Sequence, residues 1–531
     1  MKKTTIFTLI LAMLLTCVLP MGISAEAEAQ PISTVEEFEA MSATGNYYLT
    51  GDIDFGGKSY TEGYILADFS GTLDGRGYAI HNFSLSYSVS AAAAITVGVF
   101  KTVCAEGAAT IKNLKIGKED ALISVVVTDP DTGRTLVNTS LQVGLIAAKQ
   151  ASSANLLTID NVDVYADMDP TAMYCSATNV GGFVGTTYNC AISNSTMSGN
   201  AIGWTVMKKK STNVAGFVGE MRGVGGIVEN CVNYADISAY YNQYLRVGGI
   251  VSYVNPDEGS TAIVKDCVNF GKISAVDEHY SIYRFVITGD FGGIVGEIEH
   301  AGDGMIDSCI NFGDVTDVND EANGTTRCAS GGILGWARAE NTVKNCVNYG
   351  TVTPAESTSV AGAIVGSDES NGTLILTNNV DKSADVTADP SLVVGTHGVQ
   401  ESEATDGAFN VRFLATVNTL ELDSVGFEIV AYYNDNDGNA QTKTYNVSCT
   451  KVYDKIIGKA ETGLTVEETA ENLGGEYIYA LSILGVPAVA ENGNVTFVYR
   501  AVAKDGDTTV YGGTVACSYR NGEFLYCSNV G

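Results

Sequence analysis

The hexapeptide "NCVNYG" occupies Asn345–Gly350, and close relatives of it appear three times earlier in the chain. They are "NCVNYA" from Asn230, "DCVNFG" from Asp266 and "SCINFG" from Ser308. Self-similarity at intervals of a few tens of residues is the sequence signature of a repeat array. Such an array is the first feature that a fold for this chain has to explain.

A second repeated motif, a pair of small residues inside an apolar run, precedes these clusters. It reads "VGGFVG" at Val180, "VAGFVG" at Val214, "VGGIVS" at Val247, "FGGIVG" at Phe291, "SGGILG" at Ser330 and, in a degenerate form, "AGAIVG" at Ala361. The second small residues lie 31 to 44 positions apart. This uneven spacing predicts insertions that lengthen one corner of a repeat and leave the remainder unchanged.

Each repeat holds three short apolar segments bounded by Gly, Asn or Asp, the third being "DISA", "KISA", "DVTD" or "TVTP". Three short strands per repeat predict one triangular turn of a parallel β-solenoid. A helix is disfavoured because β-branched residues and glycines interrupt every apolar stripe of 3.6-residue period.

Stacked turns about 4.8 Å apart would bring equivalent positions of successive repeats together as ladders. The predicted ladders are an amide file, an aromatic file and a thiol file: Asn233, Asn269, Asn311 and Asn348; Tyr234, Phe270, Phe312 and Tyr349; Cys231, Cys267, Cys309 and Cys346. Strict alternation would turn the cysteines outward and a bend before them would turn them inward. We expect reduced, mostly buried thiols, since free Cys behaves as a small hydrophobe. We expect no metal, because these cysteines lie about 40 residues apart without histidine partners.

The residues that flank the array predict how it starts and ends. "STVEEFEAMS" from Ser33 reads as a helix capped by Ser33 or Thr34, and a helix there would cover the first edge of the solenoid. Beyond Ala404, six or seven runs of period two alternate with turns such as "NDNDGN" and fit an Ig-like β-sandwich. We therefore predict an all-β chain with a signal peptide at 1–25, a capped parallel β-helix at 26–400 and an Ig-like β-sandwich at 401–531.

The predicted signal peptide joins Lys2 and Lys3 to an apolar run and a small-residue exit, "GISAEAEA". A lipoprotein is the alternative, with Cys17 as the lipidated residue, but the apolar run continues past it. No later stretch is long and apolar enough for a membrane helix. The net charge of −31 argues against nucleic acid as a partner. We expect a secreted or cell-surface protein, with non-covalent association with the envelope as an option because no LPxTG-like signal closes the sequence.

The repeats resemble the GLUG-motif β-helix regions of bacterial surface proteins. The openings "GGIVG", "GGILG" and "VGGFVG", the "NCVNYG" clusters and an N-terminal "EEFEAM" followed by "YYLTGDIDF" and "FSGTLDGRGYAI" carry this resemblance. That N-terminal part is similar to the start of the solenoid in IgA-specific metallopeptidase-like proteins. The resemblance implies surface display and adhesion or binding. A peptidase role does not carry over, since His81, His279, His300 and His397 form no HExxH pattern.

No catalytic, cofactor-binding or metal-binding residue is assigned from the sequence. A polysaccharide-degrading β-helix enzyme would need clustered carboxylates. Asp160, Asp163, Glu229, Asp266 and Asp307 occupy related positions, but Lys265 and Lys344 alternate with them and suggest a solvent-exposed charge ladder. The loop "YNDNDGNAQ" fits a hairpin turn better than a calcium loop. A disulfide between Cys517 and Cys527 would be offset, because a two-residue Asn521–Gly522 turn pairs Ala516 with Cys527.

Aromatic residues in the insertions are the candidate ligand contacts, because their flat faces suit sugars or protein ligands. They are Tyr240, Tyr241 and Tyr244, then Tyr280, Tyr283 and Phe285, with Trp336 as a further candidate. The alternative is that these rings pack on the solenoid flank. We expect an adhesin or binding protein for an extracellular glycan or for a host or matrix protein, with a polysaccharide-degrading enzyme or a passive structural surface protein as alternatives.

Overall fold

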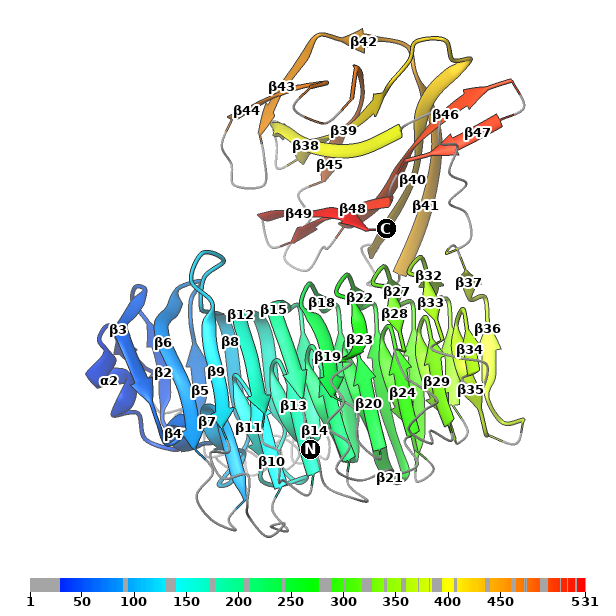
Figure 1. Cartoon of the computed structure of the whole chain (residues 1–531). Coiled ribbons are helices and arrows are strands. Elements are labelled where there is room, and N and C mark those ends of the chain that lie inside the picture. The colour runs from blue at the N-terminus through cyan, green and yellow to red at the C-terminus, as the bar shows by residue number, and fades with distance from the viewer. Residues whose placement is uncertain are drawn as a thin grey trace, which may run out of the picture.

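A computed structural model of the chain describes most of the sequence after residue 28 (Figure 1). The described residues are 29–88, 94–128, 140–171, 177–203, 211–240, 244–276, 288–299, 302–317, 327–338, 341–354, 360–370, 372–381, 383, 394–404, 408–434, 440–459, 465–471, 473, 475–487, 495–506, 508–512, 514–520 and 523–530. The predicted signal peptide lies outside them. Within them the chain is nearly all β, with a single helix, which confirms the all-β class.

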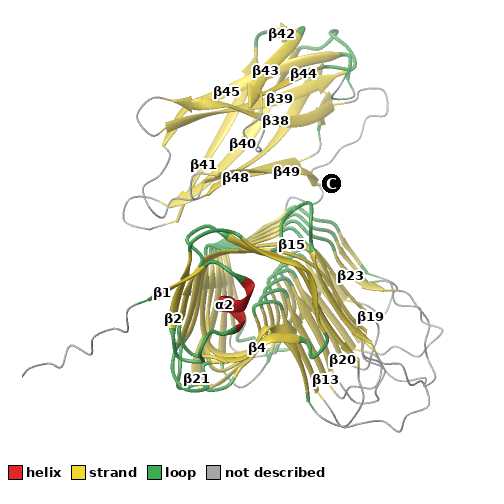
Figure 2. Cartoon of the chain, turned by 90° about the vertical axis from the view of Figure 1, so that its left-hand side faces the viewer, coloured by secondary structure: helices red, strands yellow, loops and turns green. Residues whose placement is uncertain are grey.

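Residues 30–381 form the parallel region, in which 37 described strands pair with the equivalent strands of neighbouring repeats. The pairing follows the alignment of the glycine motif: Val180 pairs with Val214, Val214 with Val247, and Val247 with Phe291. Seen from one end, the strands of successive repeats lie behind one another in layers (Figure 2).

The strands fall into files that run through the repeats. The file that enters the glycine motif holds β10 (Ser140–Gly144), β13 (Ala177–Gly181), β16 (Ser211–Ala215), β20 (Tyr244–Gly248), β24 (Thr288–Gly292), β29 (Arg327–Gly331) and β34 (Val360–Gly362). The file that leaves it holds β4 (Tyr64–Phe69), β7 (Ile95–Val103), β11 (Ala147–Gln150), β14 (Val184–Ser193), β17 (Val218–Glu229), β21 (Val251–Lys265), β25 (Val295–Ile298), β30 (Leu334–Ala337) and β35 (Val365–Asp368).

Three further files complete the repeats, and the long strands β14, β17 and β21 continue into the first of them. That file holds β1 (Gln30–Ile32), β2 (Asn46–Leu49), β5 (Thr72–Asp74), β8 (Ala109–Ile116), β12 (Leu157–Thr171), β26 (Asp303–Asp307), β31 (Asn341–Lys344) and β36 (Ile375–Thr377). The file of the Asn ladder holds β15 (Thr196–Gly203), β18 (Val232–Asn233), β22 (Val268–Asn269), β27 (Ile310–Asn311), β32 (Val347–Asn348) and β37 (Val380–Asp381). The last holds β3 (Ile53–Tyr60), β6 (Ala79–Ser88), β9 (Ile123–Thr128), β19 (Asp236–Tyr240), β23 (Ile273–Val276), β28 (Val315–Thr316) and β33 (Val352–Thr353).

The two repeated motifs pack against each other inside the repeat. The four ladder asparagines are fully buried, and each Nδ2 donates to the Oδ1 of the next: Asn233 to Asn269 at 2.8 Å, Asn269 to Asn311 at 2.8 Å, and Asn311 to Asn348 at 2.9 Å. Each also donates to a carbonyl oxygen two residues on, so the buried amides are satisfied. A Cβ atom at Gly249 would lie 2.5 Å from the amide carbon of Asn269, so only glycine fits there.

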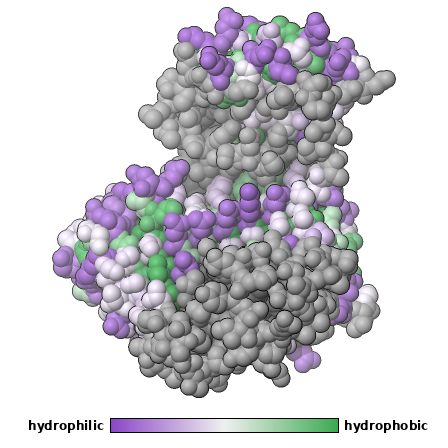
Figure 3. Space-filling view, in the orientation of Figure 1, coloured by the Kyte–Doolittle hydropathy of each residue, from purple (hydrophilic) through white to green (hydrophobic). Residues whose placement is uncertain are grey.

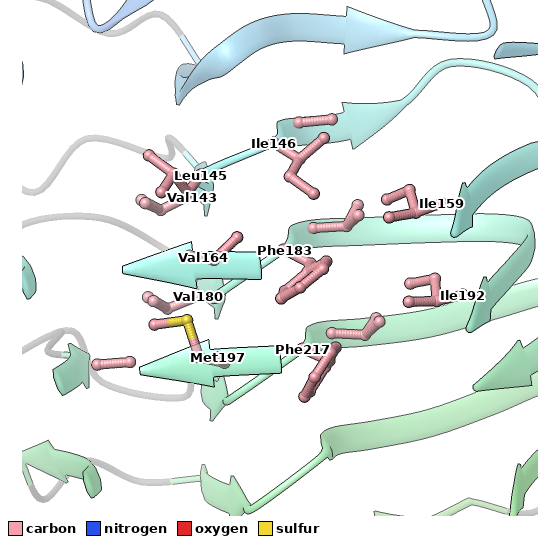
Figure 4. Close-up of a cluster of buried hydrophobic side chains, with 14 of the residues drawn as sticks. Val143, Leu145, Ile146, Ile159, Val164, Val180, Phe183, Ile192, Met197 and Phe217 are labelled. Atoms are coloured by element: carbon pink, nitrogen blue, oxygen red, sulfur yellow. The ribbon is translucent and has the colours of Figure 1, made fainter. Parts of the chain in front are cut away.

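The interior of the repeats is a continuous apolar core. In Figure 4, the labelled side chains of successive repeats lie one above another, with Phe183 beside Phe217. The centroids of these two rings are 4.4 Å apart and the rings are stacked. The single described helix, α2 (Val35–Glu39), begins at the N-cap Thr34 with a capping box to Glu37 and buries Phe38 in this core.

Residues 394–530 form the antiparallel region, two six-stranded sheets that enclose a second core. One sheet holds β38 (Val394–Ala404), β39 (Ala408–Val417), β42 (Val452–Tyr453), β43 (Lys455–Lys459), β44 (Thr465–Thr469) and β45 (Tyr477–Pro487). The other holds β40 (Ser424–Asn434), β41 (Ala440–Cys449), β46 (Val495–Asp505), β47 (Thr508–Tyr511), β48 (Thr514–Arg520) and β49 (Glu523–Val530). The boundary expected at residue 400 falls inside β38, so the change in strand pairing comes earlier, between Asp381 and Val394.

The two regions meet along an apolar stripe on the outside of the Asn-ladder file. The rings of the aromatic file stack with centroids 5.3, 4.9 and 4.9 Å apart from Tyr234 to Tyr349. Beside the rings lie Val232, Val268, Ile310 and Val347, and the cluster is completed by Val498 of β46 with Val430 and Tyr432 of β40. Figure 1 shows the β40–β41 side of the antiparallel region over the edge that carries β22, β27 and β32.

Candidate functional site

The candidate site is a cleft beside this stripe, between the parallel and antiparallel regions. It consists of two adjoining cavities of about 420 and 470 Å³ that share Asn345, Tyr432 and Thr442. The first cavity reaches from Asn345 back to Asn230, and the second reaches forward to Asn378. We call this space the interregion cleft. Figure 3 shows hydrophilic side chains along the edge of the parallel region that faces the antiparallel region.

The floor of the cleft is a file of corner residues in the left-handed backbone conformation. Asn230, Asp266, Ser308, Asn345 and Asn378 have φ angles of 59°, 53°, 54°, 55° and 56°. Asn and Asp tolerate this conformation better than other non-glycine residues, which explains their recurrence at this corner. The first four of them are also the first letters of the "NCVNYG" clusters, so each cluster places one polar side chain on the floor.

Side-chain hydrogen bonds hold the two ends of this file, and Asp266 and Ser308 in its middle are not linked to their neighbours in the file. Asn230 Nδ2 donates to Asn194 Oδ1 at 3.0 Å, and Asn378 Nδ2 donates to Asn345 Oδ1 at 3.3 Å. Ser308 instead donates to Asp307, at 3.0 Å. Within the described part of the chain, no side chain donates a hydrogen bond to the Asp266 carboxyl group. That half-buried group is therefore open to the first cavity.

The electrostatics of the floor raise the pKa of Asp266 to about 6. Burial is the main cause, Cys267 and the carboxylates of Asp307 and Glu229 add to it, and the Lys265 ammonium opposes it. Asp266 is still mostly ionised at pH 7. As a carboxylate it accepts hydrogen bonds and donates none, so a ligand in the cavity would have to present O–H or N–H groups to it.

The acidic residue next to it, Asp307, has a different role because it is held by its neighbours. Asp307 lies 3.2 Å from Lys344 Nζ and accepts from Asn345 Nδ2 at 2.9 Å. It belongs to a ladder of alternating charge in which Glu229 pairs with Lys265 at 2.6 Å. Asp266 and Asp163 do not belong to this ladder: Asp266 is in the corner file, and Asp163 of β12 pairs with Lys115 of β8 and Thr196 of β15.

The walls of the cleft come from β40, β41 and β46 of the antiparallel region. Tyr432, Tyr433, Gln441, Thr442 and Thr496 line the first cavity. The second cavity is lined by Thr444 and Asn446 of β41, and there Arg500 Nη2 lies 2.7 Å from Glu428 Oε2. Burial and the nearby Tyr349 hydroxyl raise the pKa of Tyr432, so its hydroxyl group stays protonated and can donate.

Most of the aromatic residues expected to contact a ligand lie outside the part of the chain that the structure describes. Tyr241, Tyr280, Tyr283 and Phe285 lie outside the described residues, and nothing is described of the Tyr240 side chain. Tyr244 is exposed at the start of β20. Trp336 is only 4% exposed, and the Arg338 guanidinium lies 3.7 Å from its ring centroid. The expectation that Trp336 offers an open face to a ligand is therefore corrected, because its position in β30 is covered.

The ladder cysteines are buried and reduced, which answers the question of their orientation. Cys231, Cys267, Cys309 and Cys346 are fully buried, and each Sγ donates to carbonyl oxygens of its own and the preceding repeat. Burial raises the pKa of the Cys309 thiol well above its ordinary value, so it is not a thiolate nucleophile. In the described part of the chain, no three His, Cys, Asp or Glu side chains are grouped to hold a metal ion. Cys517 is also buried, and in the strand register Ala516 pairs with Cys527.

A buried polar cluster lies on β20, β24 and β25, the strands that flank the glycine motif. The sequence patterns did not predict this cluster. Glu297 of β25 is fully buried, contacts Arg246 of β20 and binds Arg338 Nε at 2.8 Å. Burial and Glu297 raise the pKa of neighbouring Asp290 well above its ordinary value. Charges in the cluster are matched by partners, which makes it a structural network. The register of β20, β24 and β25 brings these residues together.

No protein-family model matches the chain, no curated protein matches it, and no solved structure matches it. Among the described residues, no helix is both long and apolar enough to cross a membrane.

Proposed function

We propose that the chain is an extracellular binding protein of the bacterial surface, built from a GLUG-type parallel β-helix and an Ig-like β-sandwich. In-register pairing of the repeats and the buried Asn ladder support the first assignment, and the two antiparallel sheets around one core support the second. Export is the expectation from the leader-like first 25 residues. The interregion cleft is where the ligand binds.

The observation that carries this proposal is the Asp266 carboxylate, which accepts no side-chain hydrogen bond from the described residues and lies in a cleft between two regions. An asparagine at this corner would continue the hydrogen bonds of the file, as Asn230 and Asn378 do. Asp266 instead carries a charge at the cost of desolvation, which is typical of functional sites. Carboxylate, amide, hydroxyl and tyrosine groups together suit a ligand rich in hydroxyl groups, so a glycan is the preferred ligand.

Binding of the full chain to an array of extracellular glycans and host or matrix proteins tests the proposal. We expect glycan binding that Asp266→Asn weakens ten- to a hundredfold, since a hydrogen bond to a charged group contributes about 1.5 to 3 kcal/mol. Asp257→Asn is the matched control, because Asp257 is exposed and outside the cleft. Equal binding by the two variants would place the ligand elsewhere, as in the insertion loops, and an empty array would favour a passive structural role.

A polysaccharide-degrading enzyme is the second candidate, favoured by one observation. Burial raises the pKa of Asp266 to about 6, Asp307 lines the same cavity, and a pair of carboxyl groups is what glycoside hydrolysis uses. A reducing-sugar assay on every glycan that binds separates the two functions. Binding without sugar release supports the binding protein, whereas release that Asp266→Asn abolishes would make Asp266 a catalytic acid.

A further inference from the structure

The shape of the cleft narrows the class of ligand. Its two cavities share Asn345, Tyr432 and Thr442 in their linings, so they adjoin end to end along the parallel region. The wall strands pass from one cavity to the other: Thr442 of β41 lines both, and Thr444 and Asn446 continue into the second. A space of this size suits a small or narrow ligand, whereas a folded protein partner needs about 800 Å² of surface on each side.

The floor of the cleft has a fixed period. Asn230, Asp266, Ser308, Asn345 and Asn378 come from five successive repeats, and adjacent parallel strands lie about 4.8 Å apart. Five side chains at that spacing extend over about 19 Å. Each can exchange hydrogen bonds with a ligand, so the floor presents the same kind of contact once per repeat along a straight line.

The charge of the cleft excludes strongly anionic chains. Asp307 is paired with Lys344 and Arg500 with Glu428, while Asp266 adds a negative charge that forms no ion pair with the described residues. The chain as a whole has a net charge of −31. Uronic or sulfated glycans would be repelled by this surface. The hydroxyl and amide groups that remain are suited to neutral sugars.

We infer that the interregion cleft binds a single linear, neutral glycan chain, extended along the stacking direction, with one sugar unit above each repeat. The inference rests on the proposed function and specifies the ligand for the same site. An extended β-1,4-linked chain advances by about one ring length per unit, which is comparable with the spacing of the repeats, about 4.8 Å. A folded or branched glycan would not keep this register.

Titration of the full chain with linear β-1,4-linked oligomers of glucose, xylose and N-acetylglucosamine, from one to six units, tests the inference. We expect that affinity for at least one series rises with every added unit up to about five and then stays constant. Affinity that is the same for one unit and five units would overturn the linear register and leave the binding function intact. Binding on the array only to branched glycans or to proteins, with no oligomer bound, would also overturn the linear register and leave the binding function intact.

Two variants at corner residues test whether the bound oligomer contacts the floor of the cleft. Asn345→Gly removes the side chain shared by both cavities and keeps the left-handed backbone, and we expect it to lower the affinity for the five-unit oligomer about tenfold. Asn194→Gly is the control, since Asn194 has a φ of 50° in the same file but lines neither cavity. Equal effects of the two variants would overturn the assignment of Asn345 to the ligand. Failure of all oligomers together with an empty array would overturn the proposed function itself.

Discussion

Gly293 and Asn311 lie so close together that a Cβ atom added to Gly293 would be 2.3 Å from the amide carbon of Asn311. The same atom would be 2.1 Å from the carbonyl oxygen of Gly332 in the next repeat. The glycine motif and the Asn ladder are thus two halves of one contact. This explains why the two motifs recur together in the sequence.

Gly293→Ala should destabilise the parallel region, because neither the backbone of the next repeat nor the buried amide can move away. We expect a loss of about 1 to 3 kcal/mol, as for other overpacked cores, measured as a lower urea midpoint of the full chain. Gly51→Ala is the control, since a Cβ at Gly51 meets no atom within 4 Å. Equal midpoints for the two variants would mean that the repeats are less tightly packed than described.

Asn311→Ala should remove three hydrogen bonds of the buried ladder. Asn269 Nδ2 loses one of its two acceptors, Asn348 Oδ1 loses the donor Asn311, and the Gly313 carbonyl oxygen loses the same donor. Unsatisfied buried polar groups cost about 1 to 3 kcal/mol each, so we expect a drop of at least about 2 kcal/mol in the free energy of unfolding. Asn200→Ala, which removes an exposed contact to Asp167, should have little effect.

Val498→Asp should separate the two regions without unfolding either. Val498 is 2% exposed and packs against the stripe formed by residues such as Ile310 and Phe312, so a carboxylate there would be buried without a partner. We expect a larger radius of gyration in small-angle X-ray scattering and unchanged circular dichroism. Val452→Asp, at a 38% exposed position on another strand, should leave the scattering unchanged. An unchanged radius for Val498→Asp would show that other contacts hold the regions together.

Asp266→Asn should stabilise the chain in a pH-dependent way. The folded protein keeps the Asp266 proton up to pH 6, whereas the unfolded chain loses it near pH 4. The free energy of unfolding of the natural chain therefore falls as pH rises from about 4 to about 6, and stays lower above that. The variant lacks this fall. Its free energy of unfolding should therefore exceed that of the natural chain by an amount that grows across that pH window, to roughly 1 to 3 kcal/mol at pH 7.

Urea unfolding at pH 4, 5, 6 and 7 measures this difference. Asp257→Asn, at an exposed carboxylate, supplies the baseline for a change of charge alone. A constant difference between Asp266→Asn and the natural chain at all four pH values would mean that Asp266 is solvated and that the cleft does not desolvate it. Greater stability combined with weaker ligand binding is the result expected for a residue kept for function.

Local patterns in the sequence were sufficient to predict the β class, the repeats and their alignment. The glycine openings, the amide file and the aromatic file could be aligned by eye because each repeat must present the same surface to the next. That alignment is the pairing register of the strands, from Val180 to Ala361. The alternation of Glu229, Lys265, Asp307 and Lys344 was visible for the same reason.

The sequence also contained the signal for the candidate site, the change from Asn230 to Asp266 at the first letter of the cluster. It could not show that this corner faces a second region, because the wall residues Tyr432 and Thr442 lie more than 150 positions away. Nor could it show that Trp336 is covered or that Arg246 meets Glu297, since these contacts depend on how distant segments pack.

What the sequence determined by itself is the repeating contact between neighbours, because hydrogen bonding and close packing demand the same residue at the same place in each repeat. What only the tertiary structure decided is the cleft. The residues of its floor recur once per repeat and could be predicted from the sequence, but its walls belong to strands of the antiparallel region. Their position follows from the burial of Val498 on the apolar stripe, a contact between distant segments that no local pattern encodes.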